Sequence, residues 1–362
     1  MDKMKVVEAL SKVKEPQSGK DLITLNIVTN LKVEGNQVSF TLELPSMNYP
    51  HKGPLNMACQ EELMKLDPTA EVHIHMQGGT TKAPTQTPPA LSQVKHIIAV
   101  ASGKGGVGKS TVAVNLALSL KKLGGKVGII DADLYGPSIP TMLGLVGQRP
   151  KVQEIDGKHF LLPLRHEDVP VMSIGFIVEP EQAVVLRGPR LGSILKQFIN
   201  DVVWPELDYL IIDLPPGTGD IQLTLVQSLP VTGVEMVTTP QEVALADAIK
   251  AMNMFLLPSV NVPILGVVEN MSWFTPAELP DNKYYIFGKG AGKKLAMEAK
   301  SSLLGQLPLI QSVREGGDEG KPIASQEGDA SERFEKIARN TIKQLNLRLE
   351  YQDPTSPVQI KI

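Results

Sequence analysis

A glycine-rich stretch constrains the fold of this chain more than any other feature of its sequence. Residues 103–111 read Gly-Lys-Gly-Gly-Val-Gly-Lys-Ser-Thr, which matches the pattern G-x-x-x-x-G-K-[ST]. An apolar run, His96–Ala101, precedes it, and apolar residues at helical spacing follow it as far as Gly124 and Gly125. A strand, a tight loop and a helix in this order predict a loop whose backbone N–H groups surround the phosphates of a nucleotide.

Two lysines of this loop are predicted to have different catalytic roles. Lys109 is expected to reach the β and γ oxygens of a triphosphate, and the Ser110 hydroxyl to ligate Mg²⁺. Lys104 is not required by the general pattern. It is either a surface lysine or a residue that reaches a phosphate held by a facing subunit, and we favour the second, which makes the active unit a homodimer. The predicted nucleotide ligands here are Gly103, Lys104, Gly105, Gly106, Val107, Gly108, Lys109, Ser110 and Thr111.

Carboxylates stand at the ends of two further apolar runs. One run ends in Asp131-Ala-Asp133, and the other ends in Asp213, which precedes Leu-Pro-Pro-Gly217. Ligands of an open α/β sheet lie outside the carboxyl ends of its strands, so these side chains are expected near the phosphates. We assign Asp133 to catalysis through the attacking water, Asp131 and Asp213 to Mg²⁺, and Gly217 to sensing the γ-phosphate. For any one aspartate alone, a helix N-cap or a solvated turn is the alternative.

A stretch rich in glycine, threonine and proline divides the chain. It predicts a linker at residues 79–94, because such a composition offers almost nothing to a packed core. The predicted parts are a small α+β domain at 1–78, a larger domain at 95–350 and a tail at 351–362. In the small domain the patterns predict helices at 5–13 and 55–66 and strands at 22–31, 37–44 and 71–76.

After the linker, apolar strands alternate with helical stretches. This alternation predicts an α/β fold, namely the doubly wound, mostly parallel sheet of a P-loop NTPase. The expected strands are Ile97–Ala101, Lys126–Asp131, Val171–Ile174, Tyr209–Asp213, Gly233–Thr238 and Ile264–Val268.

The last amphipathic pattern, Phe334–Leu345, is compatible with a helix on a membrane surface or with a helix packed on the sheet. Acidic and basic residues are mixed around it, which favours packing, and Asp353–Pro357 then breaks the pattern.

Charge and cysteine content limit the partners and the cellular location that we expect for this protein. A net charge of -3 over 362 residues gives no basic excess for nucleic acid or an anionic membrane. No apolar run approaches the roughly 18 residues of a membrane span, and the amino-terminal residues do not resemble a signal peptide. The single cysteine, Cys59, fits a reducing compartment. We therefore expect a cytoplasmic protein with no nucleic-acid and no membrane partner.

Seven motifs follow one another along the chain in a fixed order. They are Lys104–Thr111, Asp131–Pro140, Arg187–Pro189, Asp213–Asp220, Glu269–Ser272, Val313–Glu315 and Asp318–Pro322. With these motifs the chain resembles the deviant Walker A class of P-loop ATPases, which includes MinD and ParA, and within it the Mrp/ApbC iron–sulfur cluster carrier family. The resemblance covers about residues 94–346, and residues 6–13 with the following strands resemble the family's small amino-terminal domain related to iron–sulfur assembly factors.

This resemblance implies a homodimer that binds ATP with Mg²⁺, hydrolyses ATP slowly, and transfers a [4Fe–4S] cluster to apo iron–sulfur client proteins or works with assembly factors. It also implies that Asn270 reads the adenine.

The sequence departs from the family at the expected cluster ligands. Members usually carry a C-x-x-C pair after the Asn-Met-Ser stretch, whereas residues 273–288 here contain no cysteine, and the front domain has Tyr49-Pro50 in place of Cys-Pro. Four thiolates hold such a cluster as a rule, and a dimer of this chain has two. Cys59 is expected to be a small buried side chain. The other conceivable metal ligands are His73, His75, Glu278 and Asp281.

Two alternatives to a cluster carrier therefore stay open. The first is a nucleotide-switched dimeric adaptor of the same fold, which docks a client through the front domain or residues 273–285 and does not itself ligate a cluster. The second is a positioning ATPase of the ParA or MinD kind, which requires a basic DNA-binding face or a membrane helix and which the net charge of -3 disfavours.

Overall fold

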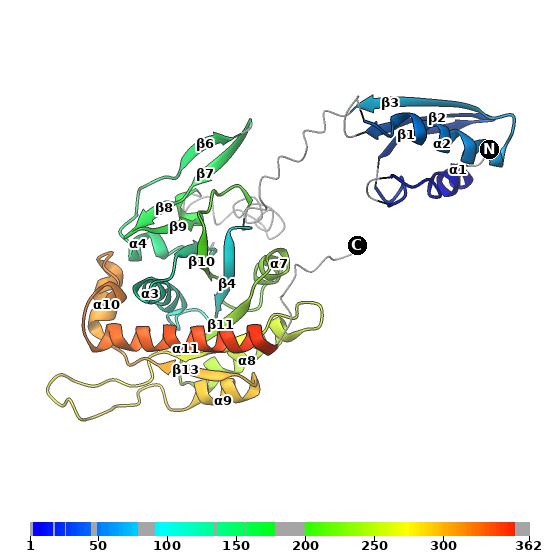
Figure 1. The fold of residues 1–362 in the computed structure, drawn as a ribbon. Coiled ribbons are helices and arrows are strands. Elements are labelled where there is room, and N and C mark those ends of the chain that lie inside the picture. Colours follow the sequence, from blue (N-terminus) through cyan, green and yellow to red (C-terminus); the bar gives the residue numbers. More distant parts are fainter. Residues whose placement is uncertain are drawn as a thin grey trace. The chain divides into compact units, whose positions relative to one another are not determined.

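The structure, a computed structural model, describes residues 3–16, 19–25, 27–44, 49–78, 91–133, 136–155, 157–177 and 200–351 (Figure 1). The chain forms two compact units, Met1–Thr87 and Pro88–Ile362. Most of the expected linker (79–90), the tail beyond Tyr351 and the Arg187–Pro189 motif lie outside the described residues. Residues 91–93 form a turn, and Val94 already belongs to the first strand of the large unit.

A three-stranded sheet and two helices make up the small unit. β1 (Val28–Glu34) is antiparallel to β2 (Gln37–Leu44), and β3 (Glu71–Gly78) is parallel to β2. α1 (Lys3–Leu10) and α2 (Lys52–Leu66) supply apolar side chains to the core of this unit. The large, fully buried side chains of that core are Leu10, Leu22, Phe40, Leu42, Leu44, Leu55 and Leu63.

The strand predicted at residues 22–31 is wrong in its first half. Asp21 Oδ1 accepts hydrogen bonds from the backbone N–H of Ile23 (3.1 Å) and of Thr24 (2.8 Å), so this segment turns instead of extending. Leu22 is nevertheless fully buried. The apolar pattern therefore predicted the burial of Leu22 correctly, but the hydrogen bonds of Asp21 make the segment a turn.

An eight-stranded sheet forms the centre of the large unit, in the order β13-β12-β11-β4-β10-β5-β9-β8. The pairs are parallel except for β8 with β9, which confirms the predicted α/β fold with a mostly parallel sheet. β6 (Lys151–Ile155) and β7 (Lys158–Leu162) form a separate antiparallel pair. The sheet strands are β4 (Val94–Ala101), β5 (Val127–Asp131), β8 (Leu164–His166), β9 (Val169–Ser173), β10 (Leu207–Asp213), β11 (Gly233–Thr238), β12 (Ile264–Glu269) and β13 (Ser302–Gln306).

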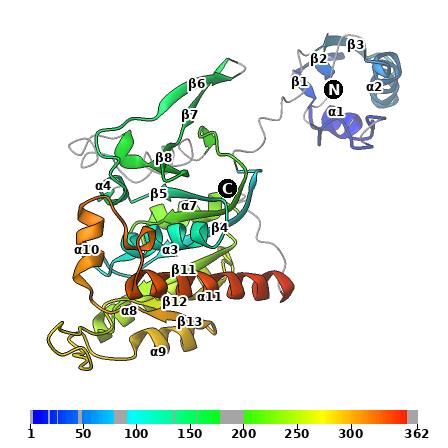
Figure 2. The same cartoon turned by 60° about the vertical axis from the view of Figure 1, so that its left-hand side comes forward.

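Helices cover both faces of this sheet (Figures 1 and 2). Right-handed crossovers place α3, between β4 and β5, on one face and α7, α8 and α9 on the other. α11 packs against α3 and so returns to the first face. The bounds are α3 (Lys109–Lys122), α4 (Ile139–Met142), α7 (Asp220–Ser228), α8 (Glu242–Leu256), α9 (Ala291–Glu298), α10 (Gln311–Asp318) and α11 (Asp329–Tyr351), with short 3-10 turns at Ile174–Phe176 and Ile323–Ser325.

α11 is a core helix. Its Phe334, Ile337 and Leu345 side chains are each at most 2% exposed. A Cβ on Gly305 of β13 would lie 2.6 Å from Ile337 Cγ1, so the helix approaches the strand closely. The packing interpretation of the last helix is thus confirmed. No helix in the described ranges has the length and apolar character needed to cross a membrane.

Two leucines of α11 give a matched test of this packing. Leu345 is 1% exposed and Leu347 is 39% exposed. We expect Leu345→Ala to lower the free energy of unfolding by about 2–5 kcal/mol, because it leaves a cavity between α11 and the sheet. Leu347→Ala should change it by less than about 1 kcal/mol. Urea unfolding followed by circular dichroism measures both, and equal effects would contradict the burial of this face.

A glutamate is buried between the sheet and α11. Thr341 Oγ1 donates a hydrogen bond to Glu235 Oε1 at 2.5 Å, and Glu235 Oε2 has no hydrogen-bond partner among the described residues. Burial raises the pKa of Glu235 from 4.5 to about 7. The folded state therefore binds a proton that the unfolded state releases above pH 4.5.

Stability should consequently fall with pH through this group. The contribution of protonated Glu235 is fully present below pH 4.5 and is lost as the pH rises through 7, a loss on the order of 3 kcal/mol. Glu235→Gln should flatten the pH dependence of the unfolding free energy between these values, whereas the exposed control Glu298→Gln should not. Parallel pH profiles for wild type and Glu235→Gln would show that this residue is not responsible.

Candidate nucleotide-binding site

The loop between β4 and α3 has a shape that its glycines permit. Gly106 and Gly108 have φ values of 80° and 82°, in the left-handed region that costs a side chain energy. A Cβ on Gly103 would lie 2.2 Å from the backbone of Asp247 in α8, so this glycine allows the loop to pack against that helix. The glycines thus allow the loop to curve tightly and to pack closely against α8.

The first turn of α3 is open to an anion. Lys109 is its first residue, and the turn has neither a side-chain cap nor an acidic residue. The first N–H groups of a helix lack partners within the helix and carry the positive end of its dipole. A phosphate at this helix end would therefore find the donors that it requires.

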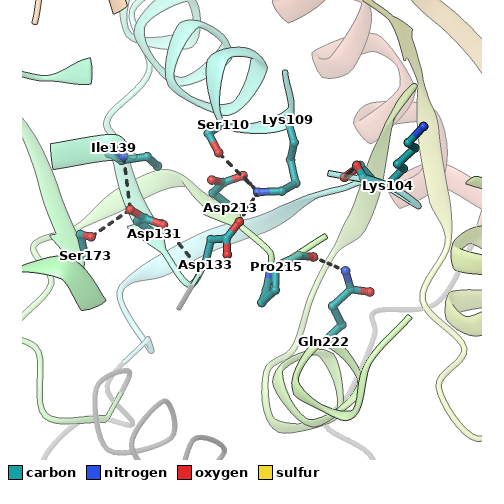
Figure 3. A network of polar contacts seen from close by, with 11 residues as sticks. Lys104, Lys109, Ser110, Asp131, Asp133, Ile139, Ser173, Asp213, Pro215 and Gln222 are labelled. Atoms are coloured by element: carbon teal, nitrogen blue, oxygen red, sulfur yellow. Dashed lines mark hydrogen bonds and ion pairs between the residues drawn. The ribbon is translucent and has the colours of Figure 1, made fainter. Parts of the chain in front are cut away.

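Lys109 forms a buried ion pair at the centre of the site (Figure 3). Its Nζ lies 2.7 Å from Asp213 Oδ1 and 3.4 Å from Asp133 Oδ2. The Lys109 side chain is 6% exposed and that of Asp213 is 0% exposed. β10 lies between β4 and β5, so the sheet order itself brings the loop and the two acidic strand ends together.

Asp131 is held by several donors. Its Oδ1 accepts from the Asp133 N–H (3.2 Å), and its Oδ2 accepts from the Ile139 N–H (3.3 Å) and from Ser173 Oγ (2.9 Å). Asp131 is also paired in register with Asp213 on the neighbouring strand. These contacts tie the segment after β5 to β9 and so favour a positioning role for Asp131, while its predicted role at Mg²⁺ stays a prediction.

The two strand-end carboxylates influence each other. Burial, and next the charge of Asp213, raise the pKa of Asp131. Burial also raises the pKa of Asp213, while the Lys109 ammonium acts in the opposite direction. The ammonium of Lys109 is therefore the nearby charge that favours the ionised form of Asp213 against the effect of burial.

Asp213 and Ser110 offer oxygen atoms that suit a magnesium ion. Asp213 Oδ2 is buried and has no hydrogen-bond partner within the described ranges, and Ser110 Oγ lies 3.4 Å from Lys109 Nζ. Hard oxygen donors of this kind, completed by water and phosphate oxygens, are what Mg²⁺ prefers. The residues present thus fit the ion.

The side chains that the structure describes do not form a metal centre by themselves. In the described part of the chain, no group of three or more His, Cys, Asp or Glu side chains is arranged to hold a metal ion. His73 and His75 lie exposed on β3, and Glu278 and Asp281 are exposed in the loop after β12. The four residues considered as further ligands therefore do not belong to such a group.

Lys104 lies outside this cluster. Its side chain is exposed and points away from Lys109 and Asp213, while its carbonyl accepts a hydrogen bond from Ser102 Oγ at 3.0 Å (Figure 3). Its ammonium is thus directed to the surface next to the loop. That position is compatible with a contact across a twofold interface, which stays a prediction.

Asn270 and Gly217 support the loop from two sides. The Asn270 side chain donates a hydrogen bond from Nδ2 to Val107 O at 2.9 Å, and a Cβ on Gly108 would lie 2.2 Å from that nitrogen. Gly217, with φ of 95°, donates its N–H to Ser102 O at 2.9 Å. The roles predicted for them, adenine recognition and γ-phosphate sensing, stay predictions.

The buried Glu269 holds the segment around Asn270. The sequence indicated it only as part of the motif Glu269–Ser272. Glu269 accepts from Ser272 Oγ (2.9 Å), from the Gly292 N–H (2.7 Å) and from Gln306 Nε2 (2.6 Å). These contacts come from β13 and α9 and from the turn itself. Only the buried position at the end of an apolar strand, shared with Asp213, could have indicated this role.

A cavity of about 410 Å³ opens beside the loop and the first turn of α3. One wall is formed by Gly108, Thr111, Asn270 and Met271, and much of the rest is apolar. A purine and ribose are of the size that such cavities hold. The remaining lining residues are Ser138, Thr141, Met142, Pro308, Leu309, Ile310, Val313, Arg314, Gly317 and Asp318.

Solved structures with this architecture include nucleotide-binding proteins. The nucleotide-binding protein from Archaeoglobus fulgidus, in complex with ADP, aligns with a TM-score of 0.58 and 38% identity over 68% of this chain and 94% of its own. The cell division ATPase MinD of Pyrococcus furiosus aligns with a TM-score of 0.50 and 25% identity over 68% of this chain and 98% of its own.

Sequence comparisons cover both units. The chain is 45% identical over 322 residues to an iron-sulfur cluster carrier protein of Synechocystis sp., covering 88% of this chain and 90% of the relative. It is 40% identical over 356 residues to that of Escherichia coli, covering 98% and 94%. A model of an iron-sulfur cluster assembly protein matches residues 3–76, and the NUBPL iron-transfer P-loop NTPase model matches residues 93–342. The chain therefore belongs to the NUBPL iron-transfer P-loop NTPase family.

Proposed function

We propose that this chain is a cytoplasmic homodimer that binds and hydrolyses ATP and acts as an iron–sulfur cluster carrier in cluster assembly and transfer to apoproteins. The observation that carries the proposal is the buried contact of Lys109 with Asp213 and Asp133 at the first turn of α3. The relatives named iron-sulfur cluster carrier protein support the biological role.

The geometry suggests how the residues act on ATP. The β- and γ-phosphates would lie at the first turn of α3, and Lys109 would exchange its contact with Asp213 for the phosphate oxygens. Ser110 would hold Mg²⁺ directly and Asp213 would hold it through water, and the ion would neutralise charge on the transferring phosphoryl group. Asp133 would orient the attacking water, and Lys104 of the partner would add a positive charge at the γ-phosphate.

The purine would occupy the cavity beside Asn270. Because the Asn270 Nδ2 already donates to Val107 O, its Oδ1 is the atom left to accept a hydrogen bond from an exocyclic amine. This assigns the specificity for adenine to a residue that also supports the phosphate loop.

The cluster, as cargo, finds no set of thiolates in this chain. Cys59 is fully buried in α2, and burial raises the pKa of its thiol to about 12, so it stays protonated. The loop after β12 has no cysteine. As a carrier the dimer would therefore need ligands from a client or another thiol. The same observation favours a second candidate, a nucleotide-switched adaptor that does not itself ligate a cluster.

Substitution of the two loop lysines should separate binding from turnover. We expect Lys109→Ala to lose ATP binding, because it removes the charge that grips the phosphates. Lys104→Ala should retain ATP affinity within about twofold. Its turnover should fall at least about 100-fold, which is the lower end of the effect of removing a group that stabilises transition-state charge. Fluorescent-ATP titration and phosphate release measure the two quantities. If Lys104→Ala hydrolysed ATP at the wild-type rate, the proposed contact of Lys104 with the phosphate of the partner subunit would be wrong.

Iron content tests the carrier against the adaptor. The Leu279 N–H donates to Pro276 O at 3.1 Å, so these two residues stand at the first and fourth positions of a turn with the spacing of a C-x-x-C pair. After anaerobic reconstitution with iron and sulfide alone, we expect the wild-type dimer to stay colourless, and with an added small-molecule thiol we expect it to gain the colour of a cluster, as the proposed carrier requires. A dimer that stays colourless with the added thiol would favour the adaptor. Pro276→Cys/Leu279→Cys should gain about one cluster per dimer, because it supplies four thiolates.

A matched substitution with serine at both positions controls for disturbance of the turn. A wild-type dimer that retained iron and acid-labile sulfide in stoichiometric amounts would show that it holds a cluster by itself and would exclude the adaptor.

A further inference from the structure

The turn between β10 and α7 is fixed to the strand that leads into the phosphate loop. The Leu214 N–H donates to Val100 O at 3.0 Å, and the Gly217 N–H donates to Ser102 O at 2.9 Å. Val100 belongs to β4, and Ser102 is the first residue after it. We refer to residues 214–219 as the β10–α7 turn.

This turn has few backbone donors. Pro215 and Pro216 have no N–H group, so Leu214 and Gly217 supply the only two N–H groups between residues 214 and 217. Both N–H groups already bond to backbone carbonyls. The sensing role predicted for Gly217 therefore requires that its N–H leaves Ser102 O and turns to the γ-phosphate. The β10–α7 turn has to change its conformation for this exchange.

A glutamine of α7 holds the middle of the turn (Figure 3). The amide of Gln222 is directed at Pro215, and its Nε2 donates a hydrogen bond to Pro215 O. Gln222 is 1% exposed and Pro215 is buried, whereas residues 216, 218 and 219 are exposed. The contact therefore anchors the turn at its buried part, while much of the rest of the turn reaches the surface.

One explanation of this contact is that it only satisfies a buried carbonyl group, as most buried carbonyls require. The second atom of the amide argues against so limited a role. Gln222 Oε1 is buried and has no hydrogen-bond partner among the described residues. An unsatisfied buried acceptor is costly, so a conformation of the turn that brings a donor to Oε1 would be stabilised.

Pro215 lies between the two residues of the turn region that were assigned to the nucleotide. It follows Asp213 by two residues and precedes Gly217 by two residues. Asp213 bonds to Lys109 at 2.7 Å, so the front end of the turn is held in the centre of the site. A displacement of the Pro215 carbonyl would consequently move the position of Gly217 relative to a phosphate bound by Lys109.

We propose that Gln222 is a positioning residue for ATP hydrolysis, a role that rests on the proposed function. By holding Pro215 O, it keeps the β10–α7 turn where Gly217 can exchange Ser102 O for the γ-phosphate. Gln222 acts through Pro215 and touches no nucleotide. The discrimination between triphosphate and diphosphate therefore depends on a side chain of α7 that lies outside the phosphate loop.

The affinities for two nucleotides test this role. The probes are ADP and adenylyl imidodiphosphate, a non-hydrolysable ATP analogue, each titrated with Mg²⁺ into the full-length chain by calorimetry. Gln222→Met keeps the length of the side chain and removes the amide. We expect it to bind ADP within about twofold of wild type and to lose at least about tenfold in affinity for the analogue, the effect of one hydrogen bond to a charged group. A wild-type ratio of the two affinities would overturn the role.

A second variant separates the hydrogen bond from packing. Gln222→Glu has nearly the same shape, but an ionised carboxylate cannot donate to Pro215 O. Burial favours the protonated carboxyl group, which can donate. The analogue affinity of this variant, divided by that of wild type, should therefore rise at least about fivefold from about pH 8 to about pH 6. The division removes titrations that both proteins share. A ratio that did not change with pH would show that the hydrogen bond to Pro215 is not what Gln222 supplies.

A matched glutamine and the turnover complete the experiment. Gln153 is exposed on β6, and Gln153→Met should match wild type in both affinities. In Gln222→Met, kcat/KM for ATP should fall at least about tenfold, in step with the analogue affinity. If Gln222→Met lost affinity for ADP and for the analogue by the same factor, it would support the loop as a whole and the positioning role would be wrong.

The wild-type titrations separate this inference from the proposed function. If wild type binds neither nucleotide, the proposed function fails. If it binds both with equal affinity, sensing by Gly217 fails and the role of Gln222 fails with it. If wild type prefers the analogue and Gln222→Met does so equally, only the role of Gln222 fails.

Discussion

The arrangement of the large unit depends on one buried ion pair, between Lys109 and Asp213. Burying two charges is costly unless they meet, and here the 2.7 Å contact and full burial of Asp213 make each side chain necessary to the other. The pair joins the first residue of α3, which follows the loop after β4, to the carboxylate that ends β10, so it links two neighbouring strands of the sheet. A triphosphate can compete for Lys109 because it offers several anionic oxygens at the same helix end.

Sheet order explains why so few residues suffice for this site. β4, β10 and β5 are neighbours although they are far apart in the sequence, and parallel pairing aligns Asp213 with Asp131. The order of the strands therefore places the phosphate loop and both acidic strand ends at the same edge of the sheet. Support comes from β12, which β11 separates from β4 in the sheet: Glu269 at its end fixes the segment whose Asn270 bonds to Val107.

The sequence predicted the parts of the structure that depend on local pattern. The phosphate loop, the buried strands and the core face of α11 follow from spacing alone, and the resemblance supplied the family. Local pattern did not predict the turn at Asp21, which a side-chain hydrogen bond stabilises. It also did not predict the short strands β8 and β13, which form by pairing with a neighbouring strand. The contact of Asn270 with the loop was also beyond reach, since the two segments meet only in the folded sheet.

Membership of a family fixes the scaffold more firmly than the cargo. The nucleotide machinery needs a lysine, a hydroxyl and strand-end carboxylates, and this chain has all of them in register. Cluster ligation needs four soft thiolates at one place, and the turn that begins at Pro276 has none. A fold that keeps the first set without the second keeps the site that the nucleotide needs, and Asn270 still links that site to the segment that follows β12.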